Sequence, residues 1–338
     1  MKYPRNAWYV AAWAHDLAPD KPTAAMILGE PLVIFRADVG LVAFEDRCAH
    51  RAAPLSLGRC EGAGLRCMYH GFLFDKQGKA VEIPGQDIIP PGAKVRTYPV
   101  VERHSWIWIW LGDPAKADDA LIPSAVGLDD PDWILGSGTI DYDAEAHLIN
   151  CNLLDFSHLS FIHPASFNSG AEFSDALPRW EKIDRGLRHI RWIEAMETPP
   201  GDRKMDRKVD YYLEYDFLVP GILLMWTGMF PTGTAQDCDF GRPNHDLAVG
   251  GVARTSQAVT PLEDGQSRYF FSVGPSRLHG DEERRDKDVA MAVMAFGEDK
   301  TMIEAQQKIL KRRPDHVIIP TAHDRAITQF NRLMNKLE

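Results

Sequence analysis

Short apolar runs separated by turn residues dominate the beginning of the chain. They lie at residues 24–28, 31–37, 41–46, 71–75, 95–101 and 106–112. Gly, Pro, Asp and Asn residues separate the runs at short intervals, which is typical of an all-β sandwich or barrel. The last run, WIWIWL at residues 106–111, is apolar on both faces and predicts a fully buried strand.

The pattern changes after the proline- and aspartate-rich segment GDPAKADDALIP at residues 112–123. This segment predicts a boundary between a domain at residues 1–115 and a domain at residues 124–338. Helical patterns follow, interrupted by strand-like runs between residues 186 and 275. The helices are expected at residues 145–163, 286–312 and 322–338. The chain is therefore predicted to be α+β, with an all-β N-terminal domain and a C-terminal domain of helices and an antiparallel sheet.

Composition narrows the range of functions. The chain has 338 residues, of which 45% are hydrophobic and 25% charged, as in ordinary globular proteins. The net charge of −10 argues against a nucleic-acid partner. Neither a signal-peptide pattern nor an apolar run long enough to span a membrane is present, so we expect a soluble cytoplasmic protein that does not bind membranes. An odd count of five cysteines favours metal ligation or plain burial over disulfides.

Three cysteines and two histidines occur within residues 48–70. Cys48 and His50 form Cys-x-His, and Cys67 and His70 form Cys-x-x-His, whereas Cys60 has no histidine at a comparable spacing. A zinc finger would pair cysteine with cysteine along the chain, and zinc is the alternative interpretation. One thiolate and one imidazole from each loop suit a Rieske [2Fe–2S] cluster, in which one iron takes both thiolates and the other takes both imidazoles.

The loops CAHRAAPLSLG and CMYHGF resemble the two signature loops of Rieske non-haem iron oxygenases. Pro54 in the first loop and Gly71 after the second suit a rigid loop and a tight turn. The opening PRNAWYVAAWA and the segment WIWIWLGDP are similar to terminal oxygenase subunits of the O-demethylase branch, which includes vanillate O-demethylase and dicamba monooxygenase.

A second group of metal-binding residue types lies in NCNLLDFSHLSFIHPAS at residues 150–166. On a helix Asp155 and His158 would lie about 60° apart, whereas His158 and His163 would lie about 140° apart. Both histidines can face one iron only if the helix is broken or bulged between them. Pro164 favours an exit from the helix after His163. The alternative is an amphipathic helix with histidines facing the solvent.

This segment resembles the Asn-x-x-Asp-x-x-His-x4-His motif of the same family. The resemblance implies that His158 and His163 ligate a mononuclear Fe(II). It further implies that Asp155 bridges to a cluster histidine of a neighbouring subunit, and that Asn152 lies beside the iron site. Cys151 stands where relatives often carry Asp.

The third iron ligand is expected to be a carboxylate far along the chain, because two histidines and one carboxylate form the usual facial triad of such iron sites. The predicted helix 286–312 offers Glu298, Asp299 and Glu304. Asp299 falls on an apolar helical face with Met302, Ile303, Gln306 and Leu310. In the family that the chain resembles, the second acid of this Glu-Asp pair is the ligand. We therefore predict Asp299, the alternative being an acid at a helix start near Gly297.

The resemblance implies a terminal oxygenase that uses dioxygen and externally supplied electrons on a small aromatic substrate. O-demethylation of a methoxylated aromatic acid with release of formaldehyde is the expected reaction. Methyl or ring hydroxylation, N-demethylation and cis-dihydroxylation stay open, as does a Rieske electron carrier without oxygenase activity. No G-x-G-x-x-G motif is present, so a separate NAD(P)H-dependent reductase or ferredoxin is the expected partner. The family resemblance also implies a homotrimer closed by head-to-tail contacts.

Basic residues surround the predicted cluster loops in an otherwise acidic chain. They are Arg47, Arg51, Arg59 and Arg66. They are candidates for docking an acidic electron donor, with ordinary solvated charge as the alternative.

Residues 221–230, GILLMWTGMF, are a candidate wall for a flat apolar substrate, with plain sheet core as the alternative. The side chains concerned are Leu224, Met225, Trp226, Met229 and Phe230. Asn244, His245 and Gln257 are candidate polar anchors for a substrate carboxylate or hydroxyl.

Overall fold

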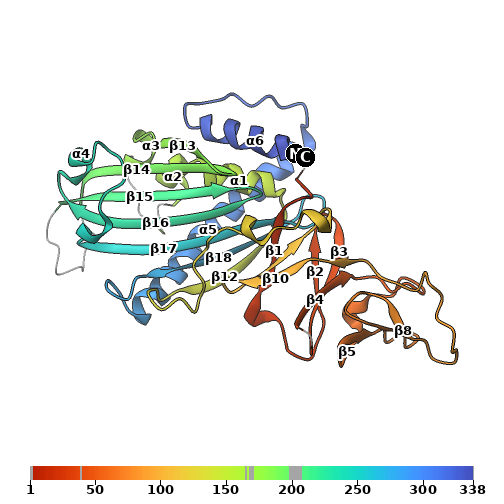
Figure 1. Ribbon diagram of the computed structural model, residues 1–338. Coiled ribbons are helices and arrows are strands. Elements are labelled where there is room, and N and C mark those ends of the chain that lie inside the picture. The colour runs from red at the N-terminus through yellow and green to blue at the C-terminus, as the bar shows by residue number, and fades with distance from the viewer. Residues whose placement is uncertain (1–2, 39, 164–165, 167–170, 198–207, 338) are drawn as a thin grey trace. The chain divides into compact units, whose positions relative to one another are not determined.

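The structure is a computed structural model that describes residues 3–38, 40–163, 166, 171–197 and 208–337. The described chain divides into two compact units (Figure 1). The N-terminal unit contains Tyr3–Ile122 and Thr260–Asp264, and the C-terminal unit contains Pro123–Val259 and Gly265–Leu337. The short segment from late in the chain is fixed within the N-terminal unit by hydrogen bonds, among them one of 2.7 Å from the Thr260 hydroxyl to the Val10 carbonyl oxygen.

The N-terminal unit is built from short antiparallel strands, which form three sheets in the described part of the chain. The first has the order β1-β11-β10, with bounds Trp8–Trp13, Trp106–Trp110 and Val100–Arg103. The second has the order β2-β3-β4-β9, with bounds Thr23–Ile27, Glu30–Ala37, Gly40–Glu45 and Thr97–Tyr98. The third has the order β5-β6-β7-β8, with bounds Arg59–Glu61, Gly64–Arg66, Leu73–Phe74 and Ala80–Glu82. The prediction of an all-β N-terminal domain is confirmed.

Strand β11 is the buried centre of the first sheet, as its apolar pattern predicts. All of its residues, Trp106–Trp110, are buried, because β1 and β10 pair with it on either side. Indole rings lock β1 to β11, with Trp13 and Trp106 centroids 5.3 Å apart. The apolar pattern did not single out β1 itself as a strand.

The C-terminal unit contains an antiparallel sheet in the order β12-β18-β17-β16-β15-β14-β13. The bounds in that order are Gly136–Tyr142, Ser267–Pro275, Gly250–Pro261, Ile222–Pro231, Lys208–Leu218, Gly186–Glu197 and Arg179–Ile183. The helices are α1 (Ala146–Leu154), α2 (Leu159–Ile162), α3 (Glu172–Asp175), α4 (Thr234–Asp237), α5 (Glu282–Arg312) and α6 (Arg325–Leu337), and the 3-10 turn η5 (Phe156–His158) joins α1 to α2. The predicted α+β fold is confirmed.

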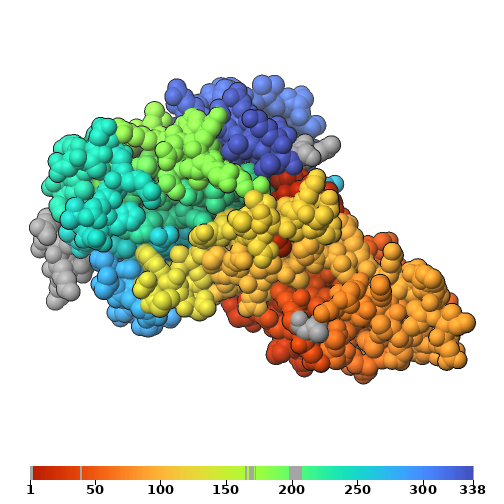
Figure 2. Space-filling model, viewed as in Figure 1, coloured from red at the N-terminus to blue at the C-terminus, as the bar shows by residue number. Residues whose placement is uncertain are grey.

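Helices cover one face of this sheet. Tyr215 of β15 lies 4.9 Å from Phe156, and Phe217, two residues further, lies 4.8 Å from Phe330 of α6 (ring centroids). Figure 1 shows α5 running along the sheet within this unit, and Figure 2 shows α6 with the segment before it (dark blue) at the unit's surface. We call the side that carries Tyr215 and Phe217 the helix face.

None of the helices in the described ranges has both the length and the apolar character needed to cross a membrane.

The other side of the sheet, which we call the opposite face, carries a second core. Trp192, Tyr212, Trp226 and Phe230 pack there with Ala235 and Val252. Because side chains alternate along each strand, residues that are neighbours in the sequence divide between these two environments.

The buried β11 gives a stability prediction. Trp108 is 0% exposed and its indole Nε1 donates to the Arg103 carbonyl oxygen at 3.1 Å. Trp108→Ala is expected to lower the free energy of unfolding by about 3–5 kcal/mol, because it removes a large buried ring and leaves a cavity. Urea denaturation followed by far-UV circular dichroism measures this. Ile88→Ala, at a side chain that is 82% exposed, is the control, and equal midpoints for the two variants would contradict the prediction.

Candidate metal centres

The two predicted cluster loops are closed by the same backbone hydrogen bonds. The Cys48 amide donates to the Ala53 carbonyl oxygen, and the Cys67 amide donates to the Phe72 carbonyl oxygen, each at 2.8 Å. Gly71 has a φ of +81°, and a Cβ there would lie 2.6 Å from a side-chain carbon of Pro84. The tight turn expected after the second loop is therefore present, and it requires glycine.

The loops place like donors together. The Cys48 and Cys67 thiols lie within hydrogen-bonding reach of each other and are buried, whereas His50 and His70 are exposed with ring centroids 4.5 Å apart. One end of the group therefore presents two sulfur donors and the other end two imidazoles, which fits a [2Fe–2S] cluster with one iron at each end. Burial, together with the neighbouring Cys67 thiol, raises the pKa of Cys48 to about 11, so cluster binding must displace protons. Cys60 lies apart from this group in β5.

The second predicted group depends on an interrupted helix. Helix α1 ends at Leu154, Asp155 has extended backbone (φ −132°, ψ 96°), and the turn η5 and the single-turn α2 follow. The helical segment predicted over residues 145–163 is therefore present but interrupted at Asp155. The interruption begins at Asp155 because its carboxylate accepts the Ser157 amide hydrogen at 2.9 Å and so caps a new turn. Pro164 lies outside the described residues.

Only the single turn α2 separates the two histidines, and His163 leaves the helical conformation (φ −109°, ψ 43°), so both rings reach one carboxylate. The Nε2 atoms of His158 and His163 lie 3.5 and 3.4 Å from Asp299 Oδ1, and one donor atom from each residue fits within a 4.8 Å group. Donors that are each about 2.1 Å from one metal ion lie roughly 3–3.5 Å apart on neighbouring vertices. The two distances to Asp299 are therefore those expected between ligands of a single ion.

Hydrogen bonds fix the protonation of both rings. His158 Nδ1 lies 2.6 Å from the Asp155 carbonyl oxygen, and His163 Nδ1 lies 2.8 Å from Glu298 Oε2. Both partners can only accept, so Nδ1 of each ring carries a proton, and in the neutral ring Nε2 presents its lone pair to the group. Burial, opposed by the Asp299 charge, lowers the pKa of His158. Burial also acts on His163, but hydrogen bonds to Asp299 and Glu298 outweigh it and raise the pKa of that ring.

Asp299 lies deep within α5, so the alternative of an acid at a helix start is wrong. The predicted companions are partly wrong as well, because Met302 is 54% exposed and Gln306 is also exposed. The buried stripe of α5 consists of Ala292, Ala295, Asp299, Ile303 and Gln307. Asn152 donates its amide Nδ2 to Asp299 Oδ1 at 3.0 Å and so holds the buried carboxylate in place.

Known proteins resemble this chain along its whole length. Residues 7–99 match the Rieske [2Fe–2S] domain, and residues 142–338 match the vanillate O-demethylase oxygenase C-terminal domain. The chain belongs to the Rieske oxygenase family.

Individual relatives agree with this assignment. A putative toluene-4-sulfonate monooxygenase system iron-sulfur subunit from Comamonas testosteroni is 41% identical, covering 98% of this chain and 96% of the relative. The vanillate O-demethylase oxygenase subunit of Pseudomonas sp. strain HR199 is 30% identical, covering 99% of this chain and 95% of the relative. A crystal structure of dicamba monooxygenase bound to 3,6-dichlorosalicylic acid superposes with a TM-score of 0.88 at 29% identity, covering 100% of this chain and 98% of that one.

The cofactors of this Rieske oxygenase are accordingly a [2Fe–2S] cluster and a mononuclear non-haem iron. The zinc interpretation of the first loops and the electron carrier without oxygenase activity are both set aside by the family assignment. The donor sets of the chain fit both cofactors: two thiols with two imidazoles in the N-terminal unit, and two imidazole Nε2 atoms with one carboxylate in the C-terminal unit.

Three residues near the iron-type group escaped the prediction. Glu298, the first acid of the Glu-Asp pair, lies behind His163, and Ser166 donates its hydroxyl to Glu298 Oε2 at 2.6 Å. Hydrogen bonds from Ser166 and His163 lower the pKa of Glu298. His323 Nδ1 lies 3.7 Å from Asp155 Oδ1. The Glu-Asp pair was the available signal for Glu298, whereas no sequence spacing connects residue 323 to this group.

The third acid of the predicted helix has a different role. Glu304 accepts the Asp143 amide hydrogen at 2.9 Å and pairs with Lys300 at the same distance. Cys151 is partly buried beside His147, with Sγ 3.5 Å from Nε2, and desolvation raises the pKa of this thiol to about 12. Neither side chain contributes to the three-residue donor group.

Strand alternation corrects the expected substrate wall. Directly opposed residues share a face, so Met225, paired with Tyr215, and Met229, paired with Tyr211, lie on the helix face. Trp226 and Phe230 belong to the core of the opposite face, which agrees with the alternative that these residues are plain sheet core.

The candidate polar anchors divide in the same way. His245 stacks on Trp226 with centroids 3.9 Å apart, and Asn244 accepts the Asp246 amide hydrogen at a turn. Gln257, opposed to Leu223, lies on the helix face and is 4% exposed.

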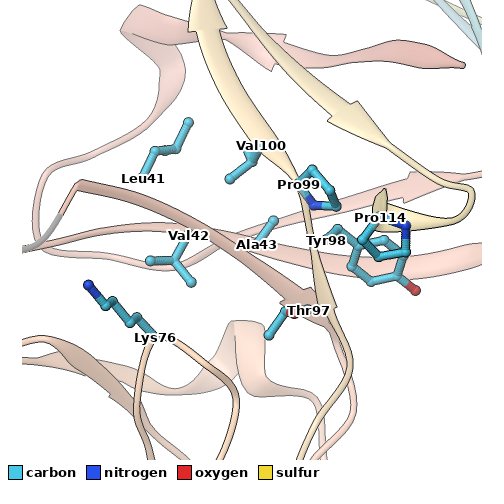
Figure 3. Close-up of a pocket in the computed structure, with 9 residues that line it drawn as sticks. All are labelled: Leu41, Val42, Ala43, Lys76, Thr97, Tyr98, Pro99, Val100 and Pro114. Atoms are coloured by element: carbon cyan, nitrogen blue, oxygen red, sulfur yellow. The ribbon is translucent and has the colours of Figure 1, made fainter. Parts of the chain in front are cut away.

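A pocket of about 380 Å³ lies in the N-terminal unit where β4 parts from β9 (Figure 3). Its walls are Leu41, Val42, Ala43, Lys76, Thr97, Tyr98, Pro99, Val100 and Pro114. Figure 3 shows Lys76 reaching in from a neighbouring hairpin toward largely aliphatic side chains. Since no candidate ligand lines it, this pocket is separate from the cluster group.

Arg66 braces the cluster loops instead of facing a partner. Its side chain is 13% exposed, and its guanidinium donates to the Gly71 carbonyl oxygen at 2.7 Å and to the carboxylates of Glu61 and Glu82. The docking hypothesis is therefore not supported for Arg66. Arg47, Arg51 and Arg59 are exposed, and for them the hypothesis stays a prediction.

Arg66→Ala is expected to lower the temperature at which the cluster's visible absorption is lost by roughly 5 °C, because several acceptors lose their donor at once. Thermal melts followed at the absorption of the oxidised cluster measure this. Arg59→Ala is the matched control, since Arg59 is 60% exposed and bonds Glu61 from the surface. Equal melting temperatures for Arg66→Ala and Arg59→Ala would show that the brace has no effect.

Proposed function

We propose that this chain is the terminal oxygenase component of a multicomponent monooxygenase, and that it oxidises a methyl carbon on a small anionic aromatic compound. The observation that carries the proposal is the convergence of two imidazole nitrogens and one carboxylate within 4.8 Å, in a chain that also holds Rieske loops. A pure electron carrier has no use for such a second group.

We assign the cluster ligands to the paired donors of the N-terminal unit. Cys48 and Cys67 supply the thiolates, and His50 and His70 supply the imidazoles. The exposure of the two imidazoles, against burial of the two thiols, supports an electron path that leaves through the histidine end. The domains proposed for these roles are residues 1–115 for the cluster and residues 124–338 for the iron.

His158, His163 and Asp299 are the proposed ligands of the mononuclear iron. Bound there, Fe(II) would supply the activation of dioxygen. Asn152 holds the Asp299 carboxylate through its amide, and the Asp155 carbonyl oxygen keeps the His158 proton on Nδ1. The Asp155 carboxylate is the proposed link to a cluster histidine of a neighbouring subunit in a homotrimer.

The named relatives support a separate electron donor. One is called an iron-sulfur subunit of a monooxygenase system and another an oxygenase subunit. We propose an NAD(P)H-dependent reductase or a ferredoxin as the partner, in the cytoplasm. One oxygen atom of dioxygen enters the substrate, and the other leaves as water with two electrons from this partner and two protons.

An anionic substrate is supported from two sides. Toluene-4-sulfonate and vanillate, which appear in the relatives' names, are both anions near neutral pH. Arg191, on the helix face opposite Leu213, is 4% exposed and donates to the Phe173 carbonyl oxygen. The Asp155 charge acts on it from beyond ion-pair distance, and no carboxylate in the described ranges forms an ion pair with it. A buried cation of this kind favours an anionic ligand.

Two methyl carbons are candidates for oxidation. Hydroxylation of a ring methyl gives a benzylic alcohol, and the 41% identity to a toluene-4-sulfonate relative, against 30% to a vanillate relative, favours it. Hydroxylation of a methoxy carbon gives a hemiacetal that collapses to a phenol and formaldehyde. This O-demethylation, the reaction expected from the sequence, is supported by the match of residues 142–338 to the vanillate O-demethylase domain.

Removing a proposed iron ligand has a measurable consequence. His158→Ala, His163→Ala and Asp299→Ala are each expected to lower the iron content from about three to about two atoms per chain, because the [2Fe–2S] cluster remains. Iron analysis beside the cluster's visible absorption measures both sites. Glu304→Ala is the control, and full iron content in a ligand variant would contradict the assignment.

The reaction class is tested with a substrate panel. Purified protein, a surrogate reductase and NADH are given methyl- and methoxy-substituted benzenesulfonates and benzoates, each beside its neutral amide. Anionic ring-methyl compounds are expected to give benzylic alcohols with lower KM than the amides. Formaldehyde release from the methoxy compounds alone would favour O-demethylation, and ring diols without either product would overturn methyl oxidation.

A further inference from the structure

The two candidate iron-binding histidines are held from behind by different chemistry. His158 donates to a neutral backbone carbonyl, whereas His163 donates to the carboxylate of Glu298 at 2.8 Å. A carboxylate behind a metal-binding imidazole makes the ring a stronger donor and restricts its rotation. The two rings therefore differ in what holds them, although both present Nε2 to Asp299.

Glu298 is itself restrained. Ser166, which is 8% exposed, donates its hydroxyl to Glu298 Oε2, the same oxygen that accepts from His163. The carboxylate is thus held between a hydroxyl and an imidazole, and its side chain is 23% exposed. This arrangement joins α5 to the chain that leaves α2.

Consecutive acids on a helix point about 100° apart, so Glu298 and Asp299 reach the same imidazole from different sides. Asp299 Oδ1 lies 3.4 Å from His163 Nε2, and Glu298 Oε2 lies 2.8 Å from Nδ1. Asp299 therefore belongs to the donor group, whereas Glu298 adds negative charge on the other side of the His163 ring. Both effects favour a divalent cation.

We infer that Glu298, held by Ser166, is a positioning residue that strengthens the binding of a divalent transition-metal ion by fixing and polarising His163. The inference rests on the proposed iron site and adds to it a determinant that contacts no metal.

Cobalt(II) tests this without turnover. Protein with an intact, oxidised Rieske cluster and an empty iron site is titrated with cobalt(II) by isothermal titration calorimetry. Glu298→Gln keeps an acceptor for His163 Nδ1–H but removes the charge, and it is expected to weaken cobalt binding by about 10–100-fold with one site retained. Ser166→Ala is expected to weaken binding less, and to add little once Glu298 is Gln, because the two act as a unit.

Cobalt electron paramagnetic resonance gives a second readout, since the oxidised cluster is diamagnetic. Glu298→Gln should change the cobalt spectrum, and metal-free Glu298→Gln should melt like wild type. Glu304→Gln, in the same helix and 17% exposed, is the matched control, and it should bind cobalt like wild type.

The outcomes separate this inference from the proposed iron site. If wild type binds no cobalt, or if His163→Ala binds it as well as wild type does, the metal site itself is wrong. If wild type binds but Glu298→Gln has unchanged affinity and spectrum, or Glu304→Gln weakens binding equally, the positioning role is wrong. Should Glu298→Gln fail to fold, unchanged cobalt affinity in Ser166→Ala overturns the role instead.

Discussion

The five-residue separation of His158 and His163 is the constraint on which the C-terminal site depends. On one uninterrupted helix the two rings would diverge by about 140°. The chain avoids this because the 3-10 turn η5 ends at His158, only the single turn α2 follows, and His163 itself leaves the helical conformation (φ −109°, ψ 43°). Asp155 starts this segment, since it leaves the conformation of α1 and its carboxylate caps the next turn. The same residue's carbonyl oxygen then fixes the His158 proton. The residue that ends α1 therefore also orients the His158 ring.

The cluster loops solve an equivalent problem with strands. Each loop is closed from its cysteine amide to a carbonyl five residues on, so each presents a thiol inward and an imidazole outward. Placing two such loops side by side pairs sulfur with sulfur and ring with ring. The separation of the thiols from the imidazoles follows from the shape of the loops. Arg66 stabilises the second loop by donating to the Gly71 carbonyl oxygen.

The group of His158, His163 and Asp299 was predicted from the family resemblance. Spacing in the sequence was enough to group Cys48 with His50 and Cys67 with His70, because ligands on one loop have fixed offsets. It was not enough where the phase of an element decides. In α5 the expected apolar face included Met302, yet the buried stripe passes through Asp299, Ile303 and Gln307. In β16 a run of apolar residues conceals which side each takes, and only the pairing with β15 separates Met225 from Trp226. His323, brought beside Asp155 by tertiary packing, has no local signal at all.

Charge balance connects these features. Asp299 is 4% exposed, and Glu298 places a second carboxylate on the far side of the His163 ring. The nearest partners of the two carboxylates are the two imidazole rings, the Asn152 amide and the Ser166 hydroxyl. A buried carboxylate such as that of Asp299 is costly unless a cation compensates its charge. A divalent ion at the convergence of the Nε2 and Oδ1 atoms would supply that charge. It would also tie the interrupted segment of residues 152–163 to α5, because its ligands come from both. Binding of the metal would therefore also stabilise the packing of the interrupted segment against α5.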